Sequence, residues 1–311
     1  MKKAILNRSC VVIRRLFPKI KLSAIGSYGC VLLIIFLSTF TVGCYNDNID
    51  RVIGGEAIEN NQDLTNGVRS YGAQLNDAYG LAQTVVKTLG GAEALINKKD
   101  VQFEFIREHI RTGKKDISIE KFIFKEGYSS GTYYVHNWEV FPNINQSIHQ
   151  ELMDNEANLF FTDEQILDQR YLLSAKETRH SNLYNFTLLF RLNEDQFLLE
   201  NWGRRKVNAI SYNLIKMSYK PTLVTNDPTV YIFYINPRTN LVDQYLYSIQ
   251  KIGISEPNIL VQLKYDTVEN ILIPVIKELY HSDKFGKPVG EMFEMQTLLN
   301  IQFDNGFGPG D

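Results

Sequence analysis

Cysteine is scarce in this chain of 311 residues: it occurs at positions 10, 30 and 44 and nowhere after them. A disulfide framework and a cysteine-based metal site are therefore excluded for the residues that follow. The five histidines stand far apart, without the spacing of a helical metal site. Gly-x-Ser-x-Gly, phosphate-loop and dinucleotide-binding glycine patterns are also missing. We therefore expect a protein that is not an enzyme and that takes neither a metal nor a cofactor.

After residue 43, basic residues are fewer than acidic ones. Residues 1–43 hold seven of the 33 Lys and Arg residues and no acid, which leaves 26 bases against 35 acids and a formal charge of −9 for the remainder. Nucleic-acid binding draws on a basic patch, so this acidic body predicts no nucleic-acid partner.

The N-terminus has the order of a secretory signal. Seven positive charges precede a charge-free stretch over 22–46, whose most apolar part is 30–40. The stretch leads to Thr41-Val42-Gly43-Cys44, which is similar to the lipobox of bacterial lipoproteins, although Thr41 departs from the usual leucine. In that family the cysteine becomes the first residue and carries a diacylglyceryl group. We expect a lipoprotein signal peptide over 1–43 and lipidation of Cys44; an uncleaved membrane-anchoring helix is the alternative.

Both interpretations predict that the rest of the chain is anchored to a membrane and lies outside the cytoplasm. Two acyl chains on one cysteine suffice for a stable anchor, where a single chain is marginal. We expect a lipid-anchored protein of the cell envelope, in the outer membrane, at its periplasmic face or at the surface. Residues 44–72 are rich in Asn, Asp and Gly and lack apolar periodicity, which predicts a flexible tether before a single domain over 73–311.

This domain begins with a helical pattern and continues with strands. Apolar residues recur at helical spacing over 75–89, and Gly90-Gly91 ends the pattern, because glycine adopts the left-handed cap conformation. Residues 92–98 predict one more short turn of helix. The spacing then changes to two, which is typical of antiparallel strands with one wet face. Ten strands are predicted, over 101–105, 117–125, 132–140, 197–205, 209–219, 230–236, 241–250, 259–266, 271–280 and 292–303.

Two local patterns refine this order. Pro237 and Asn240 predict a tight turn between 230–236 and 241–250, with Asn240 in the left-handed conformation. Residues 143–191 interrupt the strand rhythm. Within them, Thr162-Asp163-Glu164-Gln165 has the form of a capping box and predicts a helix that runs to about residue 176, followed by an apolar patch over 183–190.

A helix that ends in Gly-Gly, followed by about ten antiparallel strands with a helical insertion, resembles the LolA/LolB lipoprotein-carrier fold. It resembles more closely a family of uncharacterised lipoproteins from Bacteroidota with that architecture. The resemblance covers 75–303 and rests on Gly90-Gly91-Ala92-Glu93, the apolar insertion over 184–192, the segment 231–239 that leads to Tyr247, and Leu272-Ile273-Pro274. It implies an α+β fold that is mostly antiparallel β: a single strongly curved half-barrel sheet whose concave face is closed by the N-terminal helix and the helical insertion. In the carriers this face takes acyl chains.

A half-barrel of this size needs many large side chains to fill it, and short helices leave strand residues to line a cavity. We therefore predict reversible, non-catalytic binding of an apolar ligand, a lipid or acyl chain. The candidate cavity residues are Tyr212, Phe233, Tyr245, Val261 and Leu263, with Phe186 and Leu189 as lid residues. A register shift of one residue would turn each strand set outward. The alternative is a protein-binding module of an envelope complex, with a filled core and no ligand; the sequence does not name its partner.

Overall fold

The structure, a computed structural model, describes residues 67–220, 229–249 and 253–310. The predicted signal peptide, Cys44 and the tether up to residue 66 lie outside the described residues. The last part of the predicted tether, 67–72, is helical and belongs to helix α3. Among the described residues, no helix combines the length and the apolar character that crossing a bilayer requires.

Helix α3 (Gly67–Thr88) starts before the predicted 75–89 and ends where the glycine pair predicts. Its inner face is buried at helical spacing and consists of Ala78, Ala82, Val85 and Val86. Gly90 and Gly91 follow with φ of 121° and 97°, so the predicted helix stop is confirmed. The short helix α4 (Ala92–Ile96) comes next, also as predicted.

The strands form one sheet in which every neighbouring pair is antiparallel. It has thirteen strands in the order β6-β5-β4-β3-β2-β1-β13-β12-β11-β10-β9-β8-β7. The ten predicted strands are all present, as β1 (Asp100–His109), β2 (Lys114–Ile123), β3 (Tyr128–His136), β7 (Phe197–Val207), β8 (Ile210–Tyr219), β9 (Tyr231–Ile235), β10 (Val242–Ile249), β11 (Ile254–Val268), β12 (Ile271–Ser282) and β13 (Pro288–Phe303). The predicted hairpin turn is confirmed, with Asn240 at φ 58°.

The insertion differs from the prediction because it contributes strands as well as a helix. It holds β4 (Ile148–Met153), β5 (Glu156–Phe161) and the two-residue β6 (Glu164–Gln165), so the sheet has thirteen strands rather than about ten. The helix predicted from residue 162 to about residue 176 is wrong at both ends, because α5 spans Gln169–Thr187. Thr162 has a φ of 55° and lies in the turn between β5 and β6, whose strands pair through Phe161 and Glu164.

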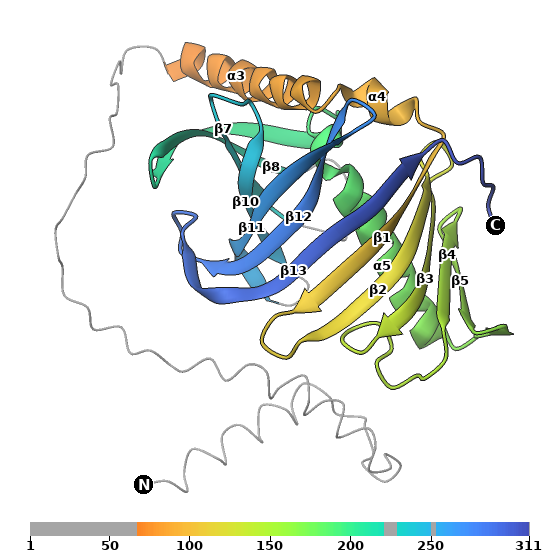
Figure 1. Cartoon of the computed structure of the whole chain (residues 1–311). Coiled ribbons are helices and arrows are strands. Elements are labelled where there is room, and N and C mark those ends of the chain that lie inside the picture. Colours follow the sequence, from red (N-terminus) through yellow and green to blue (C-terminus); the bar gives the residue numbers. More distant parts are fainter. Residues whose placement is uncertain (1–66, 221–228, 250–252, 311) are drawn as a thin grey trace, which may run out of the picture. The chain divides into compact units, whose positions relative to one another are not determined.

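Helix α5 (Gln169–Thr187) begins instead at Asp168, whose carboxylate accepts the backbone N–H of Arg170 at 2.9 Å. It continues into the 3₁₀ turn η1 (Leu188–Arg191), so the predicted apolar patch over 183–190 is divided between the end of α5 and η1. Figure 1 shows α5 on the concave side of the curved sheet, with α3 lying across one end near β7. The α+β, mostly antiparallel half-barrel with a helical insertion on its concave face is confirmed.

Alternation along the strands divides the core between the two faces of the sheet. The concave side carries the main hydrophobic cluster, which includes Phe103, Phe186, Phe233, Tyr245 and Val261. A second cluster, on the other side of β8–β11, contains Tyr212, Leu214, Ile232, Tyr234, Leu246 and Leu260. Ile215 of β8 pairs with Phe233 of the antiparallel neighbour β9, so the two share a face. Successive residues of a strand alternate between faces, so Tyr212 and Leu214 turn away from Ile215 and Phe233.

Candidate functional site

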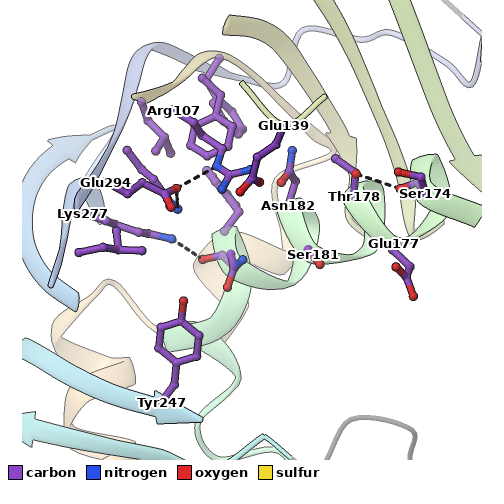
Figure 2. Close-up of a pocket in the computed structure, with 17 residues that line it drawn as sticks. Arg107, Glu139, Ser174, Glu177, Thr178, Ser181, Asn182, Tyr247, Lys277 and Glu294 are labelled. Carbon is purple, nitrogen blue, oxygen red and sulfur yellow. Dashed lines mark hydrogen bonds and ion pairs between the residues drawn. The ribbon is translucent and has the colours of Figure 1, made fainter. Parts of the chain in front are cut away.

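A cavity of about 330 Å³ lies between α5 and the concave face of the sheet (Figure 2). Its floor comes from β1, β10, β12 and β13 and its roof from α5, with Glu139 of the β3–β4 connection at the rim. The apolar part of the lining consists of Phe103, Phe105, Phe186, Leu279 and Leu298. The polar part carries two cations, Arg107 and Lys277, and three carboxylates, Glu139, Glu177 and Glu294. The cavity therefore has both an apolar and a strongly polar wall.

Strand register explains how these side chains come together. Gln296 of β13 pairs with Arg107 on one side and with Lys277 on the other, so the three form one row across the sheet. The neighbouring row runs through Glu294, Leu279, Val261, Tyr245 and Phe233. Directly opposed residues in antiparallel strands lie about 4.5–5.5 Å apart and point to the same face. Alternation thus places charged and apolar residues side by side under α5.

Arg107 is held by two carboxylates. Its Nε donates to Glu294 Oε1 at 2.9 Å and its Nη1 to Glu139 Oε2 at 2.8 Å, and its guanidinium lies 4.9 Å from the ring centre of Trp138. Burial by itself would lower the pKa of Arg107, but the charges of Glu294 and Glu139 raise it above its ordinary value. Arg107 is therefore a charge-balanced, permanently protonated part of the wall.

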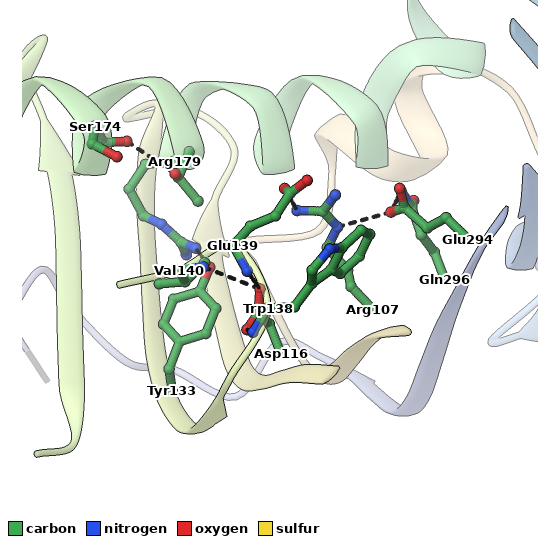
Figure 3. A network of polar contacts seen from close by, with 11 residues as sticks. Arg107, Asp116, Tyr133, Trp138, Glu139, Val140, Ser174, Arg179, Glu294 and Gln296 are labelled. Atoms are coloured by element: carbon green, nitrogen blue, oxygen red, sulfur yellow. Dashed lines mark hydrogen bonds and ion pairs between the residues drawn. The ribbon is translucent and has the colours of Figure 1, made fainter. Parts of the chain in front are cut away.

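Asp116 fixes the loop that brings Glu139 to this position. Its buried carboxylate accepts the backbone N–H groups of Trp138, Glu139 and Val140 at 3.1, 2.9 and 3.1 Å (Figure 3). A buried carboxylate needs such donors, because an unpaired buried charge is strongly unfavourable. The rim of the cavity is thereby tied to β2.

Lys277 differs from Arg107 because no carboxylate of the described residues is bonded to it. The residue is 6% exposed, and its Nζ donates to the backbone carbonyl of Asn185 at 2.9 Å, at the end of α5. Burial lowers the pKa of Lys277 from 10.5 to about 8, while the charge of Glu294 opposes the shift. Part of this lysine population is therefore neutral near physiological pH.

A buried ion pair fixes the roof of the cavity. Arg179 of α5 and Glu120 of β2 are both fully buried, with Arg179 Nη1 donating to Glu120 Oε2 at 2.7 Å. The guanidinium also donates to Tyr133 and to Gln150, and it lies where a Cβ on Gly131 would stand 2.1 Å from its Nη1. Glycine at 131 is thus required for Arg179 to reach the sheet, and α5 is clamped over β2, β3 and β4.

A smaller cavity of about 60 Å³ adjoins the first. The two share Asn185, Tyr247, Lys277, Leu279 and Gln296 in their linings, and the smaller one adds Tyr231, Tyr245 and Val261. The rings of Tyr231, Tyr245 and Tyr247 contact one another at centroid distances of 6.1 Å. Burial raises the pKa of Tyr245 and of Tyr247, so both keep their hydroxyl protons. Figure 2 shows the ring of Tyr247 rising towards α5.

The structure brings part of the predicted cavity set together. Phe186 lines the larger cavity, and Tyr245 and Val261 line the smaller one. Phe233 and Leu189 are buried in the main core instead, and Leu263 packs against it. Tyr212 is separated from all of them, because it belongs to the cluster on the other side of the sheet and donates its hydroxyl to Asp243 at 3.0 Å.

Sequence reasoning missed the charged part of the site. Arg107 continues the inward alternation of Phe103 and Phe105, and Lys277 stands two residues before the inward-facing Leu279. A charged residue at an inward position of an otherwise apolar strand face was the available signal, since charges are rarely buried without a reason. Among the described residues, no group of three or more His, Cys, Asp and Glu is placed to hold a metal ion.

No protein-family model matches the chain, and no curated protein matches it. Similar solved structures include a DUF1329 family protein from Desulfovibrio piger, with a TM-score of 0.43 and 12% identity over 76% of this chain and 95% of that one. A LolA superfamily protein from Nitrosomonas europaea has a TM-score of 0.42 and 7% identity, covering 72% of this chain and 92% of that one. The Mycobacterium tuberculosis lipoprotein LppX has a TM-score of 0.31 and 11% identity, covering 75% of this chain and 98% of that one. A LolA-type protein is thus among the structures to which this chain is similar, whereas an origin in Bacteroidota stays a prediction. No ligand or partner is transferred from these distant likenesses.

Proposed function

We propose that this protein is a non-catalytic lipoprotein of the cell envelope, anchored through Cys44, that holds a lipid or acyl chain beneath α5. The observation that carries the proposal is the cavity of about 330 Å³ between α5 and the concave sheet face. Small-molecule pockets typically measure about 300–1,000 Å³ and combine apolar walls with a few polar groups that orient the ligand. Binding requires no chemistry from the protein, only reversible burial of the ligand.

The charged residues in the cavity wall restrict the chemical class of ligand that fits the cavity. The sequence predicts an apolar occupant, but Arg107, Lys277 and Glu294 lie beside the apolar residues in the same cavity. Arg107 and Glu294 are bonded to each other, but a purely apolar molecule would displace water from Lys277, whose ammonium is bonded only to the Asn185 carbonyl among the described residues, and this is unfavourable. The site therefore suits an amphipathic molecule, whose tail lies against Phe105, Phe186 and Leu298 while its head meets the charged wall.

Lipid extraction and native mass spectrometry of the purified full chain test this function. Cys44→Ala is included in every sample, because an attached acyl chain would itself compete for the cavity. We expect a co-purifying amphiphile, and micromolar binding of a fluorescent fatty acid. Ser181→Trp should abolish both, since Ser181 is an exposed residue of α5 that lines the cavity.

Ser211→Trp is the matched control, because Ser211 is an exposed strand residue outside the cavity linings, and it should leave binding unchanged. If the chain without a tryptophan at position 181 or 211 carries no amphiphile and binds no fatty acid, the ligand-binding proposal fails. The protein-binding module would then be favoured, with crosslinked pull-down from membranes as its own test.

A further inference from the structure

Lys277 is a buried cation without a matching anion. Its ammonium carries three protons, and among the described residues its one hydrogen-bond acceptor is the neutral carbonyl of Asn185. A charged group that is removed from water needs an ionic partner or a full set of hydrogen bonds, and otherwise destabilises the fold. Lys277 also lines both cavities, so its remaining protons face the space available to a ligand.

The neighbouring carboxylates do not fill this role. Glu294 is the carboxylate whose charge acts on Lys277. Its Oε1 already accepts from Arg107 Nε at 2.9 Å and from Gln296 Nε2 at 2.8 Å. Glu139 is likewise bonded to Arg107. Among the described residues, Arg107 is therefore bonded to two carboxylates and Lys277 to none, although both stand in the same cross-strand row on either side of Gln296.

We infer that Lys277 binds the ionised head of an acid-headed amphiphile, a monocarboxylate of the fatty-acid type. This inference rests on the proposed function, because it names the head group of the ligand in the same cavity. The carboxylate oxygens would accept from the two unused ammonium protons. Tyr247, which lines the same two cavities and keeps its hydroxyl proton, is placed to add a neutral donor.

The charge of the surroundings favours a single negative charge. One unmatched cation is available, whereas Glu139, Glu177 and Glu294 also line the larger cavity. Like charges at short range raise the free energy of a bound dianion, so a phosphate monoester is disfavoured. A monoanion is neutralised by the ammonium of Lys277, whereas a dianion would leave one excess negative charge beside Glu294. The apolar tail then continues past Leu279, which lines both cavities, towards Phe105 and Phe186.

Isothermal titration calorimetry with dodecanoate and dodecanol tests the inference, because the two probes share a tail and differ in the charge of the head. The full chain is used with Cys44→Ala, after removal of bound lipid. At pH 7 we expect the wild-type cavity to bind dodecanoate about tenfold more tightly than dodecanol, or better, as for hydrogen bonds to a charged group. In Lys277→Met this preference should disappear or reverse, because an ionised head would then be buried without a cation.

Lys264→Met is the matched control, because Lys264 is exposed and paired with Glu278 at the surface. It should keep the preference for the acid. Dodecanol binding by Lys277→Met reports that the cavity is intact, and if that variant does not fold, Lys277→Gln replaces it. Equal affinities of wild type for both probes, or an unchanged preference in the folded lysine variant, would overturn the inference and leave the proposed function standing. If neither probe binds to wild type, the proposed function itself fails.

Discussion

At the scale of single residues, the unmatched charge of Lys277 should be visible in the stability of the ligand-free protein. Burial holds its pKa at about 8 against 10.5 for an ordinary lysine. Between these values the unfolded chain binds more protons than the folded one, so the free energy of unfolding rises with pH across this window. Below pH 8 the charged lysine destabilises the fold by about 3 kcal/mol relative to its neutral form.

Lys277→Met should therefore unfold at a higher urea concentration than wild type at pH 7, and the difference should shrink as the pH approaches 10. The groups that line the site with Lys277 are Arg107 from β1, Glu294 from β13, Glu139 from the β3–β4 connection, Glu177 from α5 and Tyr247 from β10, and all remain in the variant. Chemical denaturation at several pH values measures this. A stability difference that does not change between pH 7 and pH 10 would contradict a buried, titrating ammonium.

The second residue-scale prediction concerns the buried pair that clamps α5. Arg179→Leu leaves the carboxylate of Glu120 buried without its cation, and we expect a loss of about 3–5 kcal/mol in the free energy of unfolding. Replacing Glu120 by Leu as well should restore a large part of this loss, since the uncompensated charge is then gone. Lys115→Met, which breaks the more exposed pair with Glu108, is the control and should change stability by about 1 kcal/mol or less. A double variant as unstable as the single one would contradict this account.

The same residues mark a limit of sequence reasoning. The inward positions of the strands could be predicted from alternation, and Tyr245 and Val261 line the smaller cavity, while Phe186 of α5 lines the larger one. The sequence predicts Tyr212 in the same cavity, but Tyr212 lies on the other side of the sheet. Strand register across β8 and β9 cannot be determined from one sequence, and a shift of one residue reverses the face. No local sequence motif marks Arg107 or Lys277, the two cations of the site, as cavity residues. Their role depends on cross-strand neighbours such as Gln296, which comes almost 200 residues after Arg107 along the chain.

At the scale of elements, helix α3 and the turn that follows it each contain a glycine, and the same substitution should have opposite effects at the two positions. Gly80 lies inside the helix and is exposed, with nothing within 4 Å of an added Cβ, so Gly80→Ala should stabilise the protein by about 0.5–1 kcal/mol. Gly90 has a φ of 121°, and a Cβ there would lie 3.2 Å from the carbonyl oxygen of Asn270. Gly90→Ala should therefore destabilise it by about 1–3 kcal/mol.

Thermal unfolding of the two alanine variants beside wild type measures both effects. Equal shifts in the same direction would contradict the helix-stop role assigned to Gly90. The pair also explains why this boundary was predictable: the requirement for glycine is local, because it follows from the backbone conformation at one position.

The insertion was less predictable, for the opposite reason. The letters of Thr162 to Gln165 fit a helix start, yet Glu164 and Gln165 pair with Phe161 and Phe160 in a short hairpin. This hairpin extends a sheet whose other strands pair across long stretches of sequence, and that tertiary context overrides a local capping pattern. The true cap, Asp168, comes a few residues later and satisfies the backbone N–H of Arg170. Ten strands were predictable from alternation, whereas β4, β5 and β6 are short and lie in a segment that also carries a helix.

At the scale of the whole molecule, the chain separates its charge. The first 43 residues are purely basic and the rest is acidic, with Cys44 at the boundary. A basic segment followed by an apolar stretch directs a chain to the membrane, and an acidic domain on a tether stays clear of anionic lipid surfaces. Under the proposed anchoring at Cys44, a bilayer would be the source of the amphiphiles that fit the cavity under α5.

Anchoring at Cys44 is the last prediction, and it concerns residues outside the described structure. Metabolic labelling with an alkyne fatty acid should label the wild-type chain and not Cys44→Ala, because no cysteine follows position 44. Cys30→Ala is the matched control and should keep the label, since Cys30 belongs to the segment removed with the signal peptide. The labelled chain should also lack the first 43 residues, which mass spectrometry of the membrane fraction measures directly. Equal labelling of wild type and Cys44→Ala, on a chain of full length, would instead favour an uncleaved anchoring helix, for which the apolar stretch over 22–46 is long enough.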